Sequence, residues 1–252
     1  MKVVLSLLVF YVVFQHYPAQ AQQEARLCMD NYPPFTYFIG DKPAGAMVDA
    51  LEIIAEEMQF KLKYTPNTPF IRCMRMAEAG LVDFVVSLLR TPERLNYLAM
   101  FPYSTPEPSR FIVQTQMLGN LKEEKDILPL RVGLIKGFLY PKFFSGNDLH
   151  IESSSTPEAG IRKLRANQID VLALNETVAL HILQHEKNKH ETPEKPIALL
   201  DFFISWEEDS NVIGLSKKSK LITREEEIAG IIETMRIDGT FTKLIELHKK
   251  NQ

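Results

Sequence analysis

Short strand-like runs alternate with amphipathic helical stretches along most of this chain, and this order restricts the fold more than any other feature. Such alternation is typical of sheets whose parallel strands are connected by crossover helices. The sequence therefore predicts the α/β class. The expected strands cover residues 26–30, 61–64, 83–88, 110–115, 131–135, 151–153, 169–174 and 211–216.

Local capping signals place the expected helices between these strands. Thr91-Pro92-Glu93 and Thr156-Pro157-Glu158 each set a capping hydroxyl before a proline, which suits the first position of a helix. Gly80 ends a helix over 72–79 as a C-cap, and Asn175 caps a helix that runs to about residue 185. Further helices are expected over 48–60 and from residues 223 and 240, with a charged loop over 121–126.

The alternating elements form two sets, joined by strand-like segments near residues 110 and 213. A chain that crosses to a second lobe and returns leaves a cleft between the lobes. Such an interface is a preferred site for a small ligand, and two crossing strands allow it to close.

The first residues have the layout of a secretory signal peptide. Lys2 precedes an apolar run over 3–14, and Ala19-Gln20-Ala21 supplies a small-x-small cleavage site. The alternative, a membrane anchor, needs about 20 apolar residues, more than this run contains. Gln22 would follow the cut, and because it is not cysteine we expect a freely soluble exported protein.

The chain has 29 Lys and Arg residues and 32 Asp and Glu residues, so it has no excess of positive charge. Proteins that bind nucleic acids usually have such an excess, and no nucleic-acid partner is expected.

Export changes the interpretation of the two cysteines, since an oxidising compartment allows Cys28 and Cys73 to form a disulfide. Two buried thiols are the alternative. Neither cysteine has a second ligand at metal spacing, so no zinc site is expected. His181 and His185 are four residues apart on an expected helix, where they indicate a solvated last turn rather than a metal site.

Several short motifs resemble family 3 of the extracellular solute-binding proteins, the amino-acid-type binding proteins of bacterial transporters. They are, in order, Tyr32-Pro33-Pro34-Phe35, Gly80-Leu81-Val82-Asp83, Thr91-Pro92-Glu93-Arg94 and Asp238-Gly239-Thr240-Phe241. Phe70-x-Arg72-Cys73 together with Cys28 is similar to a divergent branch of that family. The resemblance covers essentially the whole chain after the signal peptide. It implies a periplasmic, type II two-lobed fold, with lobe 1 over 22–109 plus 214–252 and lobe 2 inserted over 110–213.

The resemblance also implies a set of ligand-binding residues in the cleft. Tyr32 and Phe70 match aromatic rings on either side of the ligand, although both could instead be core residues. Arg94 matches the arginine that binds the ligand carboxylate, and a surface ion pair with Glu93 is its alternative. The remaining candidates flank matched positions or line the second lobe; they are Arg72, Ser87, Arg90, Thr91, Phe138, Asn175 and Glu176.

Three positions depart from the family pattern. Leu89 replaces a usual hydroxyl residue, and Gly137-Phe138-Leu139 stands where a small hydroxyl residue often contacts the carboxylate. Asn175 occupies the place of the acid that pairs with the ligand ammonium, and Glu176 beside it is a conceivable substitute. Recognition of a carboxylate is therefore partly kept, and a standard α-amino acid is less expected than in the family at large.

The leading hypothesis is a monomeric, non-enzymatic protein that captures a small polar or carboxylate-bearing solute and delivers it to an ABC transporter in the membrane. No cofactor is expected. Three alternatives stay open: a sensing module for a membrane receptor, a dehydratase-like enzyme of the same fold, and a scaffold whose cleft has lost its ligand. Leu89 and Leu139 favour the last of these, because both are apolar at cleft positions.

Overall fold

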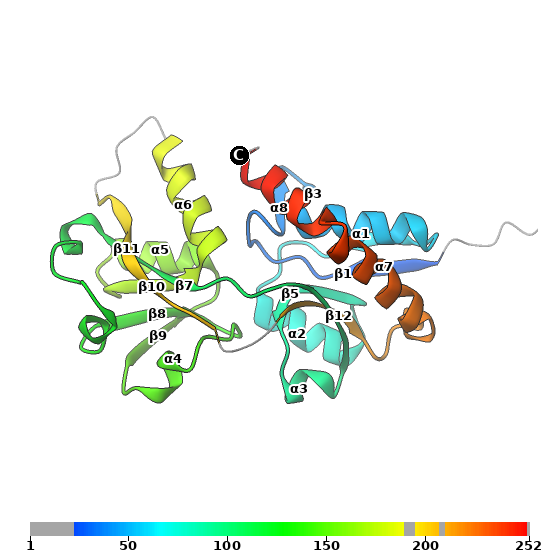
Figure 1. The fold of residues 1–252 in the computed structure, drawn as a ribbon, viewed down its shortest axis with the longest axis horizontal. Helices are drawn as coiled ribbons and strands as arrows, with labels where there is room; N and C mark the ends of the chain where they lie inside the picture. The colour runs from blue at the N-terminus through cyan, green and yellow to red at the C-terminus, as the bar shows by residue number, and fades with distance from the viewer. Residues whose placement is uncertain (1–22, 189–194, 207–209, 251–252) are drawn as a thin grey trace, which may run out of the picture.

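The computed structural model describes residues 23–188, 195–206 and 210–250, which form two α/β lobes, each built on its own five-stranded sheet (Figure 1). The predicted fold class is thereby confirmed. The expected signal peptide, residues 1–21, lies outside the described residues. Within the described part of the chain, no helix is both long enough and apolar enough to cross a bilayer.

The first sheet, which defines lobe 1, has the strand order β4-β1-β5-β12-β6. Its strands are β1 (Glu24–Leu27), β4 (Lys61–Tyr64), β5 (Phe84–Leu89), β6 (Leu98–Ser104) and β12 (Asn211–Ser216). Strand β1 pairs in parallel with β4 and β5, whereas β12 is antiparallel to β5 and β6. Because β12 comes late in the sequence, the first sheet combines strands from before and after the segment that forms lobe 2.

Helices cover both faces of this first sheet (Figure 1). On one face lie α1 (Ala46–Glu57), α7 (Glu225–Ile237) and α8 (Thr240–Lys250), and on the other lie α2 (Phe70–Ala79) and α3 (Pro92–Leu95). A hairpin of β2 (Tyr37–Ile39) and β3 (Lys42–Ala44) precedes α1. The two C-terminal helices therefore belong to the lobe in which the chain begins.

The second sheet, which defines lobe 2, has the order β11-β7-β10-β8-β9. Its strands are β7 (Ser109–Gln114), β8 (Arg131–Ile135), β9 (His150–Ser154), β10 (Val171–Asn175) and β11 (Ile197–Ile204). The helices of this lobe are α4 (Phe143–Gly146), α5 (Pro157–Arg165) and α6 (Glu176–Asn188), and short 3-10 turns span Thr115–Met117 and Glu124–Ile127.

The chain passes between the sheets twice. It leaves the first sheet after Ser104 and enters the second at Ser109, and it returns between Ile204 and Asn211. Residues 211–213, which lie before the expected lobe boundary at 214, already pair with β6 of the first sheet.

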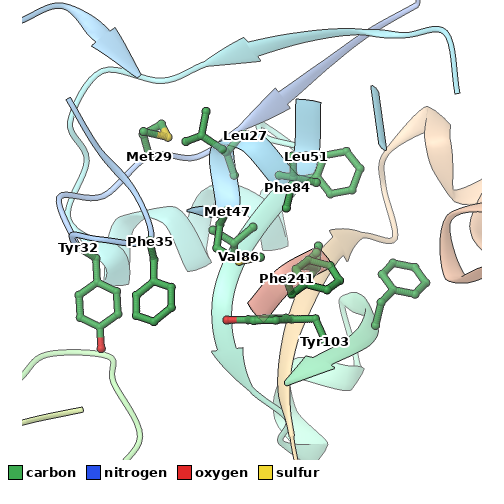
Figure 2. Close-up of a cluster of buried hydrophobic side chains, with 14 of the residues drawn as sticks. Leu27, Met29, Tyr32, Phe35, Met47, Leu51, Phe84, Val86, Tyr103 and Phe241 are labelled. Atoms are coloured by element: carbon green, nitrogen blue, oxygen red, sulfur yellow. The ribbon is translucent and has the colours of Figure 1, made fainter. Parts of the chain in front are cut away.

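Buried side chains connect the two lobes as well as filling each one. One hydrophobic cluster contains Leu27, Phe84 and Phe241 of lobe 1 together with Ile135 and Leu172 of lobe 2. Figure 2 shows the lobe 1 part of this cluster, where the rings of Tyr32 and Phe35 lie side by side. Burial of this kind contributes about 25 cal/mol per Å² of apolar surface, so the contact between the lobes itself stabilises the observed arrangement.

The two cysteines are joined, as predicted from their number and from the export signal. Cys28 follows β1, Cys73 lies in α2, and their disulfide spans Cα atoms 5.5 Å apart. The bond closes an interval of 45 residues and fixes α2 against the end of the central strands.

Several elements differ from the expected ones. Strands β6 and β11, the hairpin β2–β3 and the short helix α4 had no counterpart in the sequence-based assignment. Helix α7 begins at Glu225 rather than at residue 223, because residues up to Arg224 form a 3-10 turn capped by the Ser219 hydroxyl. The expected loop over 121–126 contains the start of a second 3-10 turn.

Candidate functional site

A cavity of about 60 Å³ lies between the two lobes and is lined by residues of both. Lobe 1 contributes the segments after β1 and β6, the end of β5, the start of β12 and one residue each of α2 and α3. Lobe 2 contributes the start of β7, the segment after β8 and the end of β10. Six of the ten predicted ligand-binding residues line it, namely Tyr32, Phe70, Ser87, Arg94, Phe138 and Asn175. Interfaces between domains are preferred locations for small-ligand sites.

Arg94 is the buried cation of this cavity. It lies in the single turn of α3, which Thr91 caps by accepting a hydrogen bond from the Arg94 backbone N–H at 3.1 Å. The guanidinium donates to the carbonyl oxygens of Leu89 at 2.8 Å and Gly137 at 3.0 Å, and it lies 5.8 Å from the Phe70 ring centroid. Arg94 is only 7% exposed, which removes the surface ion pair with Glu93 as its explanation.

Burial lowers the pKa of Arg94 from its ordinary value, because desolvation disfavours the charged form. Carbonyl oxygens orient a guanidinium but do not neutralise it. A carboxylate brought into the cavity would supply the missing negative charge through charge-assisted hydrogen bonds.

Ser87 has an unusual backbone beside this cation. Its φ of 57° lies in the left-handed region, within β5, where the pairing with β12 shifts register between Val212 and Gly214. Its Oγ is buried and has no hydrogen-bond partner among the described residues, and the Tyr103 hydroxyl is its polar neighbour. Ser87 therefore combines a left-handed backbone conformation with a buried hydroxyl in the cavity lining.

Tyr32 and Phe70 are both buried, each 6% exposed, but they do not face each other across empty space. The ring of Phe138, from lobe 2, packs edge-on against both, with centroids 5.0 Å from Tyr32 and 5.0 Å from Phe70. On its other side Tyr32 stacks on Phe35 at 5.7 Å. Tyr32 and Phe70 thus both line the cavity and pack against other aromatic rings.

Asn175 ends β10 and begins α6. Its Oδ1 accepts a hydrogen bond from the Val178 backbone N–H at 2.9 Å, so its side chain is the predicted N-cap as well as part of the cavity wall. Glu176 does not line the cavity; its carboxylate pairs with Arg110 at 2.8 Å.

The carboxylate that does line the cavity belongs to Glu107, in the segment that leaves lobe 1. It accepts hydrogen bonds from the backbone N–H of Thr177, at 2.8 Å, and from the Thr177 hydroxyl. Both groups lie at the N-terminus of α6, where the helix dipole favours an anion. The structure therefore places a negative charge near Asn175, from a residue that the sequence did not single out.

The other three predicted residues lie outside the cavity lining. Arg72 and Arg90 are exposed, and Thr91 acts through its cap on α3. Besides Glu107, the lining residues that sequence reasoning missed include Tyr140, Trp206 and Asn211. Glu107 and Trp206 lie in the two stretches that connect the sheets. Their place between the expected lobes was the only sequence feature that could have pointed to them.

A larger groove of about 650 Å³ also lies between the lobes, bordered by the β2–β3 hairpin, α5 and α6. His181 and His185 line this groove, and burial together with the neighbouring His185 lowers the pKa of His181. Among the residues that the structure describes, no group of three or more His, Cys, Asp or Glu side chains is arranged to hold a metal ion.

Comparison with solved structures shows the same fold in amino-acid-binding proteins. An amino acid ABC transporter substrate-binding protein from Streptococcus pneumoniae, bound to L-arginine, has a TM-score of 0.77 at 21% identity, covering 90% of this chain and 94% of that chain. An arginine transport periplasmic binding protein from Legionella pneumophila has a TM-score of 0.75 at 17% identity, covering 90% and 100%.

An ancestral amino acid-binding protein, a precursor of cyclohexadienyl dehydratase, has a TM-score of 0.72 at 18% identity, covering 90% of this chain and 97% of that chain. A comparison with curated proteins finds no match. The profile of the bacterial extracellular solute-binding proteins, family 3, matches residues 26–250. With its two α/β lobes and the cavity between them, this chain belongs to the bacterial extracellular solute-binding proteins, family 3.

Proposed function

We propose that this protein is exported, captures a small carboxylate-bearing solute between its lobes without transforming it, and delivers it to a membrane importer of the ABC type. One observation carries the proposal: Arg94 is a buried cation in the interlobe cavity whose hydrogen-bond acceptors are two uncharged carbonyl oxygens. A carboxylate satisfies such a guanidinium in a two-pronged geometry that few other small groups match.

The surroundings of Arg94 support this role. Ser87 offers a buried hydroxyl, and the Leu89 and Gly137 carbonyls hold the guanidinium in one orientation. The proposed division, with lobe 1 over 22–109 and 214–252 and lobe 2 over 110–213, makes Arg94 and Gly137 partners from opposite lobes. Ligand binding and lobe closure then involve the same arginine.

The family and the N-terminal residues support export and delivery as part of this proposal. We propose that cleavage after about Ala21 releases a monomeric protein into the periplasm, where its partner is a transporter permease. Uptake of the identified ligand should fall in cells that lack the protein and recover when it is restored. Unchanged uptake with loss of a ligand-dependent cellular response would favour the receptor alternative instead.

Binding itself is tested with protein purified after export. Thermal shift and calorimetry against amino acids, small organic acids and short peptides should reveal saturable binding of carboxylates, with L-arginine included because the pneumococcal relative holds it. Arg94→Ala should weaken that binding by about 10- to 150-fold, the equivalent of a charge-assisted hydrogen bond. Arg75→Ala, an exposed arginine of α2, is the matched control and should bind as the wild type does.

Two results would contradict the proposal. One is the absence of any carboxylate response in the folded wild type, which would favour a scaffold with a non-functional cleft. The other is equal affinity in wild type and Arg94→Ala. Mass spectrometry of ligand after incubation distinguishes capture from catalysis, since a binding protein returns its ligand unchanged.

A further inference from the structure

Phe138, from lobe 2, packs against both aromatic side chains of the lobe 1 site, Tyr32 and Phe70. Its ring lies at interplanar angles of 90° to Tyr32 and 82° to Phe70, with both centroid distances 5.0 Å. Edge-to-face contacts at this distance are favourable packing rather than a clash. Phe138 therefore fills the space between two rings that would otherwise be available to an apolar part of a ligand.

The backbone fixes Phe138 in this place. Its N–H donates to the Ile135 carbonyl at 3.1 Å, which turns the chain immediately after β8. Gly137 has a φ of 90°, and a Cβ there would lie 3.1 Å from side-chain atoms of Ile71 in α2. The Gly137 carbonyl accepts from Arg94 at 3.0 Å. The turn thus lies directly against lobe 1, and the ring that follows it has little freedom.

The space that remains is small, and charged side chains are part of its lining. A cavity of about 60 Å³ is far smaller than the roughly 300–1,000 Å³ of ordinary small-molecule pockets. Two charged side chains line it, the guanidinium of Arg94 and the carboxylate of Glu107. An occupant that satisfies both needs a carboxylate for Arg94 and a hydrogen-bond donor for Glu107.

We propose that Phe138 occupies the place of a ligand side chain and thereby restricts this cleft to compact carboxylates of two or three carbons that carry an amino or hydroxyl group. The proposal rests on the proposed function and specifies its substrate class. Arg94 receives the carboxylate. Glu107 accepts from the amino or hydroxyl group, since a carboxylate has about four acceptor positions and Thr177 uses two of them.

Glu107 makes the cleft select ligands by their hydrogen-bond donor as well as by their size. Asn175 is uncharged, and Glu176 is paired with Arg110. Within the described residues lining the cavity, Glu107 is the carboxylate available to a donor on the ligand. Acetate and propionate, which have no donor, should therefore bind at least about ten-fold more weakly than glycine, alanine, glycolate or lactate.

The test is a size series on three proteins purified after export: wild type, Phe138→Ala and the matched control Phe203→Ala. Phe203 is a 46% exposed lobe 2 phenylalanine that does not line the cavity. Calorimetry with glycine, L-alanine, glycolate, L-lactate, L-leucine and L-phenylalanine gives the affinities. Wild type and Phe203→Ala should prefer the compact ligands by at least about ten-fold, and Phe138→Ala should gain at least about ten-fold for leucine and phenylalanine.

The outcomes separate the inference from the proposed function. Wild-type protein that binds leucine or phenylalanine as tightly as glycine overturns the inference and leaves carboxylate capture standing. An unchanged preference in Phe138→Ala overturns it as well. If neither protein binds any carboxylate, the proposed function fails and the inference fails with it. Should Phe138→Ala not fold, Phe138→Leu and the wild-type size series still decide the question.

Comparison of the amino acids with the hydroxy acids identifies the ligand group that donates to Glu107. Glu107→Gln should weaken amino-acid binding at least about ten-fold more than hydroxy-acid binding if an ammonium group is the ligand's donor, because the ion pair is lost. Equal affinities of wild type and Glu107→Gln for every ligand would overturn the part assigned to Glu107. A higher affinity for acetate than for glycine or glycolate would do the same.

Discussion

The guanidinium of Arg94 in lobe 1 donates a hydrogen bond to the carbonyl oxygen of Gly137 in lobe 2, over 3.0 Å. The same guanidinium is the buried cation of the interlobe cavity. On the proposed function, a ligand carboxylate that pairs with Arg94 would act on this contact between the lobes. The turn at Gly137 should therefore be sensitive to small changes.

Gly137→Ala should weaken the contact between the lobes. A residue with a Cβ is strained at a φ of 90°, and that Cβ would press on Ile71 at 3.1 Å. We expect a loss of about 1 to 3 kcal/mol in unfolding free energy or in lobe closure. Chemical denaturation and small-angle scattering measure the two quantities. Gly119→Ala, where a Cβ meets open space, is the control, and equal behaviour of both variants would contradict the prediction.

Reduction of the Cys28–Cys73 disulfide should destabilise lobe 1. The bond closes 45 residues, and the chain-entropy model gives about 4 kcal/mol for a loop of this length. Urea unfolding with and without dithiothreitol measures the difference. The double variant Cys28→Ser, Cys73→Ser should show no dependence on the reductant. A wild-type midpoint that does not move on full reduction would show that the bond contributes little.

Asp30 should make stability depend on pH between about 4 and 6. Burial raises the pKa of this carboxyl from 3.8 to about 6, although the Thr36 hydroxyl donates to it at 2.8 Å. The folded state therefore holds the proton more tightly than the unfolded chain. The associated stability is present below pH 4 and is lost as pH rises through 6.

Asp30→Asn removes this titration and keeps an acceptor for Thr36. At pH 7 the variant should be more stable than wild type by up to about 3 kcal/mol, and the difference should vanish near pH 3.5. Thermal or urea unfolding across that range measures it. Asp41→Asn, in the exposed turn between β2 and β3, should track wild type. A constant difference between Asp30→Asn and wild type at all pH values would contradict the assignment.

Asn175→Ala should cost about 1 kcal/mol of folding stability, because the Val178 N–H loses its cap at the start of α6. Asn175→Asp keeps the acceptor and adds a charge that the helix N-terminus favours, so it should equal or exceed wild type. Denaturant midpoints compare the three proteins. If Ala and Asp at this position destabilise equally, the side chain acts through the cavity rather than through the cap.

Local signals in the sequence predicted the elements that local chemistry forms. Strands β8 and β12 have the expected bounds, and the caps at Thr91, Thr156 and Asn175 are formed by the predicted side chains. Strand β6 escaped prediction because Pro102 interrupts its pattern, which an edge strand tolerates. The hairpin β2–β3 escaped because each strand is only three residues long.

The residues of the candidate site also differ in whether the sequence could predict them. Tyr32, Phe70 and Arg94 were predictable because short motifs mark them, and all three line the cavity. Glu107 and Trp206 were not, since each lies in a connecting stretch and reaches the cavity only when the lobes are brought together.

The sequence by itself determined the α/β class, the pairing partners available to the two cysteines and the presence of Arg94 at a position that lines the cavity. Only the tertiary structure decided what surrounds that cation. Phe138 meets Tyr32 and Phe70 across the cleft, and Glu107 places its charge where Asn175 has none. The physical reason is separation along the chain: caps and strand periods act over a few residues, whereas these contacts require both lobes to be folded and docked.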